Sequence, residues 1–468
     1  MPAAAKIALG AALLLGLLAG GVLRSDRPSD RGSDRGCRDG RPARSAPCPP
    51  AAAVRRRPAR AVPLDARAFV NTIGVNTHLF YLDTSYGDYA MVKRRLLELG
   101  VRHIRDGLDP AHTRRFFDRV NDLRAAGIRS TLIACRVEAP GVPWTTYVKD
   151  AKRRVRSSLD ALEGVNEPDL VAAGTAWSRS ARICQGAVFR QAKHSSFGAP
   201  LRVPVLGPSV QAGNGELGRI SDRADGAALH PYPGGGPPSG PEGHPLRSQM
   251  ADARNNQFGG SRVPVYATET GYHDALNTMT DHPPVSQKAA SIYLPRLFLE
   301  YARAGVRRTF AYELVDERPD PGLGDVELNY GLFESDWTYK PSAVALKNTI
   351  ALLASRRKGP RRPLRYGLAN IADPDGAGTG GAVRDLLLQK ADGSYWLALW
   401  QDSTVWDQHA RTDIANPSTP VRVTLDRRMA LTSYHPTQGT SASGRRTARS
   451  FTADVGDDVL LIEMTRAR

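Results

Sequence analysis

The sequence lacks the features that mark several common classes of protein. It has four cysteines in 468 residues, and their spacing matches no zinc-binding pattern. No glycine-rich phosphate loop follows the first predicted strand, where GVNTHLFY stands instead, which argues against a dinucleotide-binding sheet. A metal-dependent barrel hydrolase would carry a His-x-His pair at that point, but NTHLF has one histidine. We therefore expect neither a metal ion nor an organic cofactor.

Acidic residues are too few to balance the basic ones. The chain has 64 Lys and Arg against 47 Asp and Glu, which gives a formal net charge of +17. Residues 1–67 hold 13 Lys and Arg against 5 Asp, so this segment carries eight of those charges, and the rest is spread over the remaining chain. A basic arm of this kind either binds an anionic surface or is a solvated tail. We expect no nucleic-acid function.

A long apolar run occurs at the start of the chain, in MPAAAKIALGAALLLGLLAGGVL, residues 1–23. One lysine followed by apolar and small residues is typical of a secretory signal peptide, and an uncleaved membrane anchor is the alternative. No cysteine directly follows the run, which argues against a lipoprotein anchor. Both interpretations predict a secreted or extracytoplasmic protein, and the second adds association with the membrane or cell wall.

Residues 24–67 are rich in Arg, Asp, Pro and Gly and nearly free of large apolar side chains. Such a segment buries too little surface to offset its chain entropy, so we predict a disordered linker. Cys37 and Cys48 lie in it, and Cys135 and Cys184 lie in the body of the chain. Export permits disulfides, and a Cys37–Cys48 bond is sterically simple, but the spacing leaves the pairing open.

From residue 68 to residue 358 the sequence alternates short β-branched or apolar runs with segments of helical periodicity. The first helix, within 87–100, ends at Gly100, and the last, within 340–357, begins with Pro341 in a position suited to a first turn. Eight such units predict a parallel (β/α)₈ barrel, an α/β fold. A doubly wound open sheet is the competing architecture.

After residue 358 the period of the hydrophobic pattern changes. RDLLLQKADGSYWLALWQDS, TPVRVTLDRRMALTSYH and DDVLLIEM alternate with a period of two and are separated by turn dipeptides such as Asp392-Gly393. Residues 359–468 are therefore predicted to form a small antiparallel β-sandwich.

The carboxyl ends of barrel strands meet at one mouth, where function concentrates. The polar residues predicted there, and the cysteine among them, are Asn76, His78, Arg105, Asp106, Cys135, Arg136, Asn166, Glu167, Ser209, His230, Tyr232, Glu269, Tyr312 and Glu313. Glu167 and Glu269 end the fourth and seventh strands, and we expect their side chains to face one point. Two opposed carboxylates suit the cleavage of a glycosidic bond.

Three motifs carry a resemblance to a known group: GVNEPD on the fourth strand, HPY on the sixth and ATETGY on the seventh. In this order they resemble the signature positions of the clan A retaining glycoside hydrolases. The likeness extends over about residues 70–355, including YGLFESDWTYKPSAVALKN before the last helix. A β-sandwich after the barrel is also common in related families, such as those of β-xylosidases.

The resemblance implies roles for individual residues. Glu167 would be the general acid/base, with a raised pKa, and Glu269 the nucleophile, so that an oligo- or polysaccharide is cleaved with retention. Asn166 would bind the sugar 2-hydroxyl and Tyr232 would donate to Glu269.

Other residues would complete the site. His230 would line its wall, and His78 lies at its rim. Arg105 would pair with Glu269 or, in the alternative interpretation, with Asp106 or another carboxylate at the rim. Members of this clan commonly place a tryptophan at the end of the eighth strand, where this chain has Tyr312. Trp144 is a candidate for the missing sugar platform, and packing of its loop is the alternative.

Two other functions use the same residues. A catalytically silent carbohydrate-binding barrel would be expected to lose one carboxylate or its supporting side chains, and this chain keeps both carboxylates with Asn166 and Tyr232. A transglycosylase would use the same site as a hydrolase. We therefore predict a glycoside hydrolase acting on a β-linked glycan and keep both alternatives.

Overall fold

The computed structural model describes residues 54–135, 144–171, 176–240, 244–278, 282–371 and 382–467. The predicted signal peptide or anchor and the pair Cys37 and Cys48 lie outside these ranges. Within them, no helix has the length and hydropathy that a membrane span requires.

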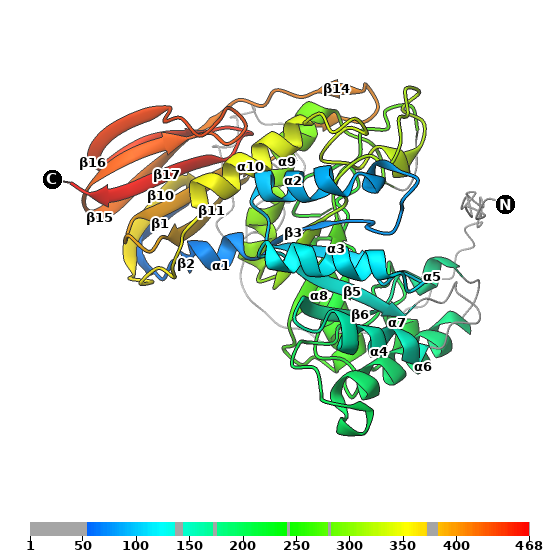
Figure 1. The fold of residues 1–468 in the computed structure, drawn as a ribbon. Helices are drawn as coiled ribbons and strands as arrows, with labels where there is room; N and C mark the ends of the chain where they lie inside the picture. The colour runs from blue at the N-terminus through cyan, green and yellow to red at the C-terminus, as the bar shows by residue number, and fades with distance from the viewer. Residues whose placement is uncertain are drawn as a thin grey trace, which may run out of the picture. The chain divides into compact units, whose positions relative to one another are not determined.

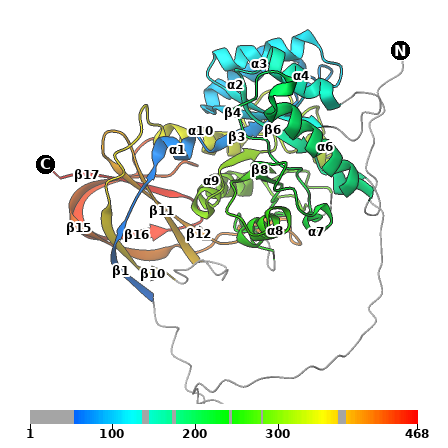
Figure 2. The same ribbon diagram turned by 90° about the horizontal axis from the view of Figure 1, so that it is seen from below.

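Residues 73–311 form a parallel barrel (Figures 1 and 2). Its strands are β3 (Ile73–Asn76), β4 (His103–Gly107), β5 (Arg129–Cys135), β6 (Leu159–Val165), β7 (Ala227–Leu229), β8 (Val265–Thr270) and β9 (Arg308–Ala311). They are hydrogen-bonded in the order β6-β5-β4-β3-β9-β8-β7. Every pair in this sheet is parallel, as the βα alternation predicted.

The gap between β6 and β7 is filled by residues 205–210. Single parallel bridges join Val205 to Leu162 in β6 and Leu206 to Gly226 beside β7, and two more bridges follow. The predicted fifth strand is therefore present as an irregular segment that completes the barrel between β6 and β7. It does not form a regular ladder because Pro204 and Pro208 have no N–H group to donate.

Helices cover the outside of the barrel strands (Figure 2). The long helices are α2 (Tyr89–Leu99), α3 (Arg114–Ala125), α4 (Trp144–Arg154), α6 (Ala176–Lys193), α8 (Leu246–Phe258), α9 (Gln287–Ala304) and α10 (Pro341–Leu353). Short helical segments are α1 (Ala66–Val70), α5 (Pro168–Val171), α7 (Asn214–Leu217), η1 (Ser85–Gly87), η2 (Ser195–Phe197) and η3 (Val326–Leu328). Gly100 ends α2 in the left-handed conformation, with φ 79°, and Pro341 opens α10, both as predicted.

Within the described ranges, the second domain is a sheet of eight strands, antiparallel except where β2 pairs with β11, and two of its strands come from the predicted linker. The strands are β1 (Val54–Ala61), β2 (Leu64–Asp65), β10 (Leu364–Ile371), β11 (Ala382–Gln389), β12 (Tyr395–Asp402), β15 (Thr419–Tyr434), β16 (Gly444–Val455) and β17 (Leu460–Arg466). A two-stranded ribbon, β13 (Trp406–Asp407) and β14 (Thr412–Asp413), lies apart. Because β1 pairs with β10 and β2 with β11, the prediction of a disordered linker is wrong for residues 54–65. The pairing uses backbone groups, and an edge strand tolerates the many arginines of β1.

The long strand β15 makes the domain a sandwich. Its first half pairs with β10 and its second half with β17. Along its other edge β15 pairs with β16, with a register shift between Thr424 and Met429. Side chains from both halves fill one apolar layer that includes Leu368, Val423 and Ile462. The opposite face of β12, through Trp396 and Trp400, belongs to the same apolar core as the barrel helices. The predicted fold, a barrel followed by a small sandwich, is confirmed.

Candidate active site

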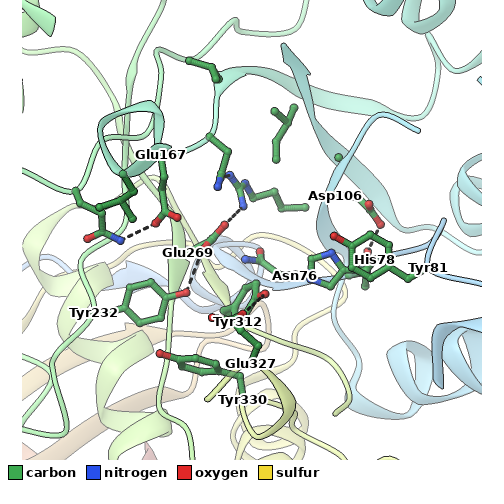
Figure 3. A pocket seen from close by; sticks show the side chains of 18 of the residues that line it. Asn76, His78, Tyr81, Asp106, Glu167, Tyr232, Glu269, Tyr312, Glu327 and Tyr330 are labelled. Carbon is green, nitrogen blue, oxygen red and sulfur yellow. Dashed lines mark hydrogen bonds and ion pairs between the residues drawn. The ribbon is translucent and has the colours of Figure 1, made fainter. Parts of the chain in front are cut away.

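A pocket of about 320 Å³ opens at the carboxyl ends of the barrel strands (Figure 3). Its lining comes from the ends of β3, β4, β5, β6 and β8 and from the loops that follow β7 and β9. Its polar and aromatic lining includes Asn76, His78, Tyr81, Arg105, Asp106, Asn166, Glu167, Gln211, Tyr232, Glu269, Tyr312, Glu327 and Tyr330. Most of the polar positions predicted for the barrel mouth are therefore brought together here.

The two predicted catalytic carboxylates face each other across this pocket. Glu269 lies in β8, and Glu167 follows β6, where the backbone turns into α5 with a φ of 41° at Glu167. One oxygen of Glu167, one oxygen of Glu269 and one nitrogen of His230 all lie within 4.8 Å of one another. Carboxyl groups lie about 5–5.5 Å apart in retaining glycosidases and about 6.5–9.5 Å apart in inverting ones, so this close approach favours the retaining geometry.

Glu269 is oriented by two donors. The Arg105 guanidinium donates from Nη1 to Oε1 of Glu269, and the Tyr232 hydroxyl donates to Oε2 at 3.0 Å. Arg105 is itself held by a carboxylate behind it, since its Nε and Nη2 donate to Glu163 at 2.7 and 2.8 Å. Glu163 is fully buried, so the charge of Arg105 is matched inside the barrel. Of the pairings considered for Arg105, the one with Glu269 is present, together with the pair to Glu163.

Glu167 has a different set of partners. Gln211 Nε2 and His230 Nδ1 each lie 2.6 Å from its Oε1, so Oε2 remains available to a ligand. Burial by itself raises the pKa of Glu167, but the His230 imidazolium, the bond from Gln211 and the charge of Arg105 lower it more, to about 2. The expectation of a raised pKa is therefore wrong for this geometry. Burial opposes protonation of His230, yet the charges of Glu269 and Glu167 raise its pKa.

Asn166 lies next to both carboxylates. Its side-chain oxygen accepts a hydrogen bond from Arg105 Nη2 at 2.6 Å, which fixes the amide and leaves its NH₂ group as the donor for a ligand. A backbone bridge to Ser209 holds the residue at the end of β6. Its contact with a sugar hydroxyl stays a prediction.

The far side of the pocket carries a second polar group around His78. Its Nε2 lies 3.2 Å from Glu313, which is buried, and its ring stacks on Tyr81 at 4.6 Å between centroids. Burial disfavours the charged imidazole, but the charge of Glu313 raises the pKa of His78 to about 9. Asn76 is 2 % exposed, and neither polar atom of its side chain has a hydrogen-bond partner among the described residues. Such an amide is suited to sugar hydroxyls.

Aromatic side chains form the remaining wall of the pocket. Tyr312, at the position where the clan commonly has tryptophan, packs edge-on against Tyr330 at 5.2 Å and donates to Glu327 at 3.2 Å. Although Glu327 is exposed at the mouth, desolvation in the pocket and the carboxylates of Glu313 and Glu269 raise its pKa to about 7. Trp144 begins α4, but its side chain lies outside the described part of the chain, so its role as a platform stays a prediction.

Sequence reasoning did not identify Glu163, Gln211 or Glu327. Glu163 could have been found, because a carboxylate inside the apolar strand LDALEGV needs a buried cation, and Arg105 was the candidate. Gln211 and Glu327 lie in loops, where the sequence carries no periodic signal.

Among the described residues, two sets of side chains could hold a metal ion: His78, Glu313 and Glu317, and Glu167, His230 and Glu269. Within each set, hydrogen bonds or ion pairs between histidine and carboxylate account for the close approach without an ion. A disulfide joins Cys135, at the end of β5, to Cys184 in α6, which answers the open question of pairing for these two cysteines.

Comparisons with known proteins agree on the fold. No family model matches the chain, and no curated protein matches it. Solved structures do match, among them a glucosidase from Croceicoccus marinus, with a TM-score of 0.56, 13% identity and coverage of 87% of this chain and 97% of that one. A monomeric β-xylosidase from Caulobacter crescentus CB15 aligns with a TM-score of 0.54 at 15% identity over 87% and 98%. A family 39 glycoside hydrolase from Bacteroides cellulosilyticus WH2 gives 0.54 at 15% identity over 86% and 82%. The chain therefore has the barrel-plus-sandwich fold of family 39 glycoside hydrolases, as the motif resemblance implied.

Proposed function

We propose that this chain is a retaining glycoside hydrolase that cleaves a β-linked glycan. The observation that carries the proposal is the placement of Glu167 and Glu269 oxygens within 4.8 Å at the carboxyl mouth of the barrel. The fold shared with a glucosidase, a β-xylosidase and a family 39 hydrolase supports it.

In the first step, a carboxylate oxygen of Glu269 attacks the anomeric carbon and the glycosidic bond breaks. Arg105 and Tyr232 direct that carboxylate at the sugar, and the NH₂ group of Asn166 donates to the 2-hydroxyl as the ring becomes oxocarbenium-like.

The proton for the leaving oxygen is held by the pair His230 and Glu167. Because the pKa of His230 is raised and that of Glu167 is lowered, the resting proton lies on Nδ1 of the histidine, 2.6 Å from the carboxylate. As the leaving oxygen gains negative charge, Nδ1 of His230 gives this proton to Oε1 of Glu167, and a turn of the carboxyl group presents the O–H to the leaving oxygen, which takes the proton and leaves His230 neutral and Glu167 ionised. The pair titrates as a unit. In the second step, Glu167 accepts a proton from the water that hydrolyses the glycosyl-enzyme.

The test is a panel of polysaccharides and aryl glycosides. Glu269→Ala should abolish turnover of every substrate that the wild type cleaves. Glu167→Ala should lose about 10²–10⁴-fold on substrates with poor leaving groups and less on activated aryl glycosides, which need little acid assistance. Glu216→Ala, an exposed glutamate in α7, is the control.

Wild-type rates in Glu269→Ala would refute the assignment of the nucleophile. If the wild type binds glycans but cleaves none of them, the silent carbohydrate-binding barrel replaces the hydrolase. Transfer of sugar to an acceptor alcohol in place of water would identify a transglycosylase.

Export is also part of the proposal and rests on the N-terminal sequence alone. Cleavage near Ala19–Gly21 would give a secreted protein, and an intact N-terminus in the membrane fraction would identify an anchor. Mass spectrometry of the N-terminal peptide from fractionated cells distinguishes the two, and recovery of the protein in the cytoplasm would contradict both.

A further inference from the structure

A second cavity, of about 630 Å³, lies at the end of the barrel opposite the pocket. Its walls come from the amino ends of β4 and β5, from the last residues of α2 and α10, and from α1. None of its lining residues belongs to the candidate active site. We refer to it as the basal cavity.

The basal cavity gathers positive charge from distant parts of the chain. Its cationic lining residues are Arg67, Arg102, Arg129, Lys347 and Arg356. The one carboxylate in the lining, Glu98, already accepts hydrogen bonds from Arg94, Arg95 and Tyr339 at 2.9, 2.7 and 2.7 Å. These hydrogen bonds lower the pKa of Glu98 to about 2, and the one from Tyr339 has the largest effect. Glu98 is therefore engaged elsewhere and does not neutralise the cavity.

The five cations make no ion pair with any residue in the described ranges. Arg67 donates to the backbone oxygen of Arg356 and Arg129 to that of Leu159, both at 3.2 Å. Lys347 lies over the ring of Tyr339 at 5.2 Å. Asp160 does not line the cavity and is held by Arg308 at 2.9 Å and by His103 at 3.4 Å, and the charge of Arg129 contributes to its lowered pKa.

Stabilisation of helix ends does not account for this arrangement. Cations near a helix carboxyl end are favourable, and Arg67 and Lys347 lie in helices. Arg102 precedes β4, Arg129 begins β5 and Arg356 follows α10, so three of the five are outside helices. Like charges in one cavity repel one another, and an anion bound among them removes that cost.

We propose that the basal cavity binds a multiply charged, phosphate-bearing ligand. Guanidinium groups form paired hydrogen bonds with phosphate oxygens, and a phosphate group offers more charge and more acceptors than a carboxylate. Four arginines and a lysine around one cavity match a ligand with several phosphoryl groups. The site is independent of glycan cleavage at the other end of the barrel.

Isothermal titration of the full chain with tripolyphosphate, at constant ionic strength, tests the proposal. Saturable binding of one ligand per chain is expected. The variant Arg102→Gln/Arg356→Gln removes two exposed arginines of the cavity and should weaken binding about tenfold or more, because each loses a charge-assisted hydrogen bond. The matched control, Arg114→Gln/Arg115→Gln, removes two exposed arginines of α3 and should change the affinity less than about twofold.

Two sources of phosphate are distinguished by further titrations with inorganic phosphate and with a short single-stranded oligodeoxythymidylate. Binding of either that depends on Arg102 and Arg356 supports the site and identifies its source as a free phosphate or a phosphodiester chain. The proposal is overturned if tripolyphosphate does not saturate the wild type. Equal losses in the two double variants, or equally tight binding of a tricarboxylate, would also overturn it.

Discussion

Asp106 provides a quantitative test of the electrostatics of the pocket. It ends β4, is 2 % exposed, and accepts hydrogen bonds at Oδ2 from the Thr77 hydroxyl at 2.7 Å and from the Leu79 amide at 2.9 Å. Its Oδ1 has no hydrogen-bond partner among the described residues. Burial raises the pKa of Asp106 to about 7, although the charge of His78 opposes the shift.

The folded protein therefore holds the Asp106 proton more tightly than the unfolded chain does. The resulting stability is present at low pH and is lost as pH rises toward 7, by about 1.4 kcal/mol for each pH unit. Asp106→Asn keeps an oxygen acceptor for Thr77 and Leu79 and removes the titration. Relative to wild type, we expect this variant to gain about 2–3 kcal/mol more in unfolding free energy at pH 8 than at pH 5.

Urea unfolding followed by tryptophan fluorescence at the two pH values measures this difference. Asp118→Asn, an exposed aspartate of α3, is the control and should show no comparable dependence on pH. If Asp106→Asn changes stability equally at pH 5 and pH 8, or destabilises the protein more at pH 8, the argument from burial is refuted.

Two further predictions concern His230, which holds the proton for the leaving oxygen, and the disulfide. His230→Asn removes the cation beside Glu167. The alkaline limb of the pH–rate profile, which in the wild type is set by the raised pKa of His230, should therefore move to lower pH. If the limb does not move, this histidine does not hold the proton for the leaving oxygen. Reduction of the Cys135–Cys184 bond, which closes a loop of 49 residues, should cost up to about 4 kcal/mol and lower the midpoint of thermal unfolding. The same midpoint with and without reductant, against a Cys135→Ser/Cys184→Ser control that is insensitive to reductant, would contradict a stabilising disulfide.

The barrel was predictable because its signals are local. Apolar runs, helical periodicity and end signals such as Gly100 and Pro341 each act within one turn or strand. The pairing of β1 with β10 was missed because it rests on backbone hydrogen bonds between residues about 300 positions apart, and the arginines of β1 show no apolar alternation. The irregularity of the fifth strand could have been predicted from Pro204 and Pro208, because a proline disrupts a β-ladder at its own position.

The candidate site was predictable where topology alone brings residues together. Arg105 and Glu269 lie near the carboxyl ends of parallel strands and Glu167 follows one, so a barrel places them at one mouth whatever their partners are. The pKa of Glu167 was predicted with the wrong sign because it depends on which side chain lies 2.6 Å away, and that is His230, from another strand. Gln211 was missed for the same reason, since the choice of partner is made in three dimensions.

The most direct test of the proposed function is to trap the glycosyl-enzyme. An activated 2-deoxy-2-fluoro glycoside of the sugar that is cleaved best slows both steps and allows the covalent intermediate to accumulate, and peptide mass spectrometry then locates the bound sugar. The account predicts one sugar per chain, attached to Glu269 and absent from Glu269→Ala. A wild type that turns over its substrate without becoming labelled, or a label on Glu167 or any other residue, would contradict it.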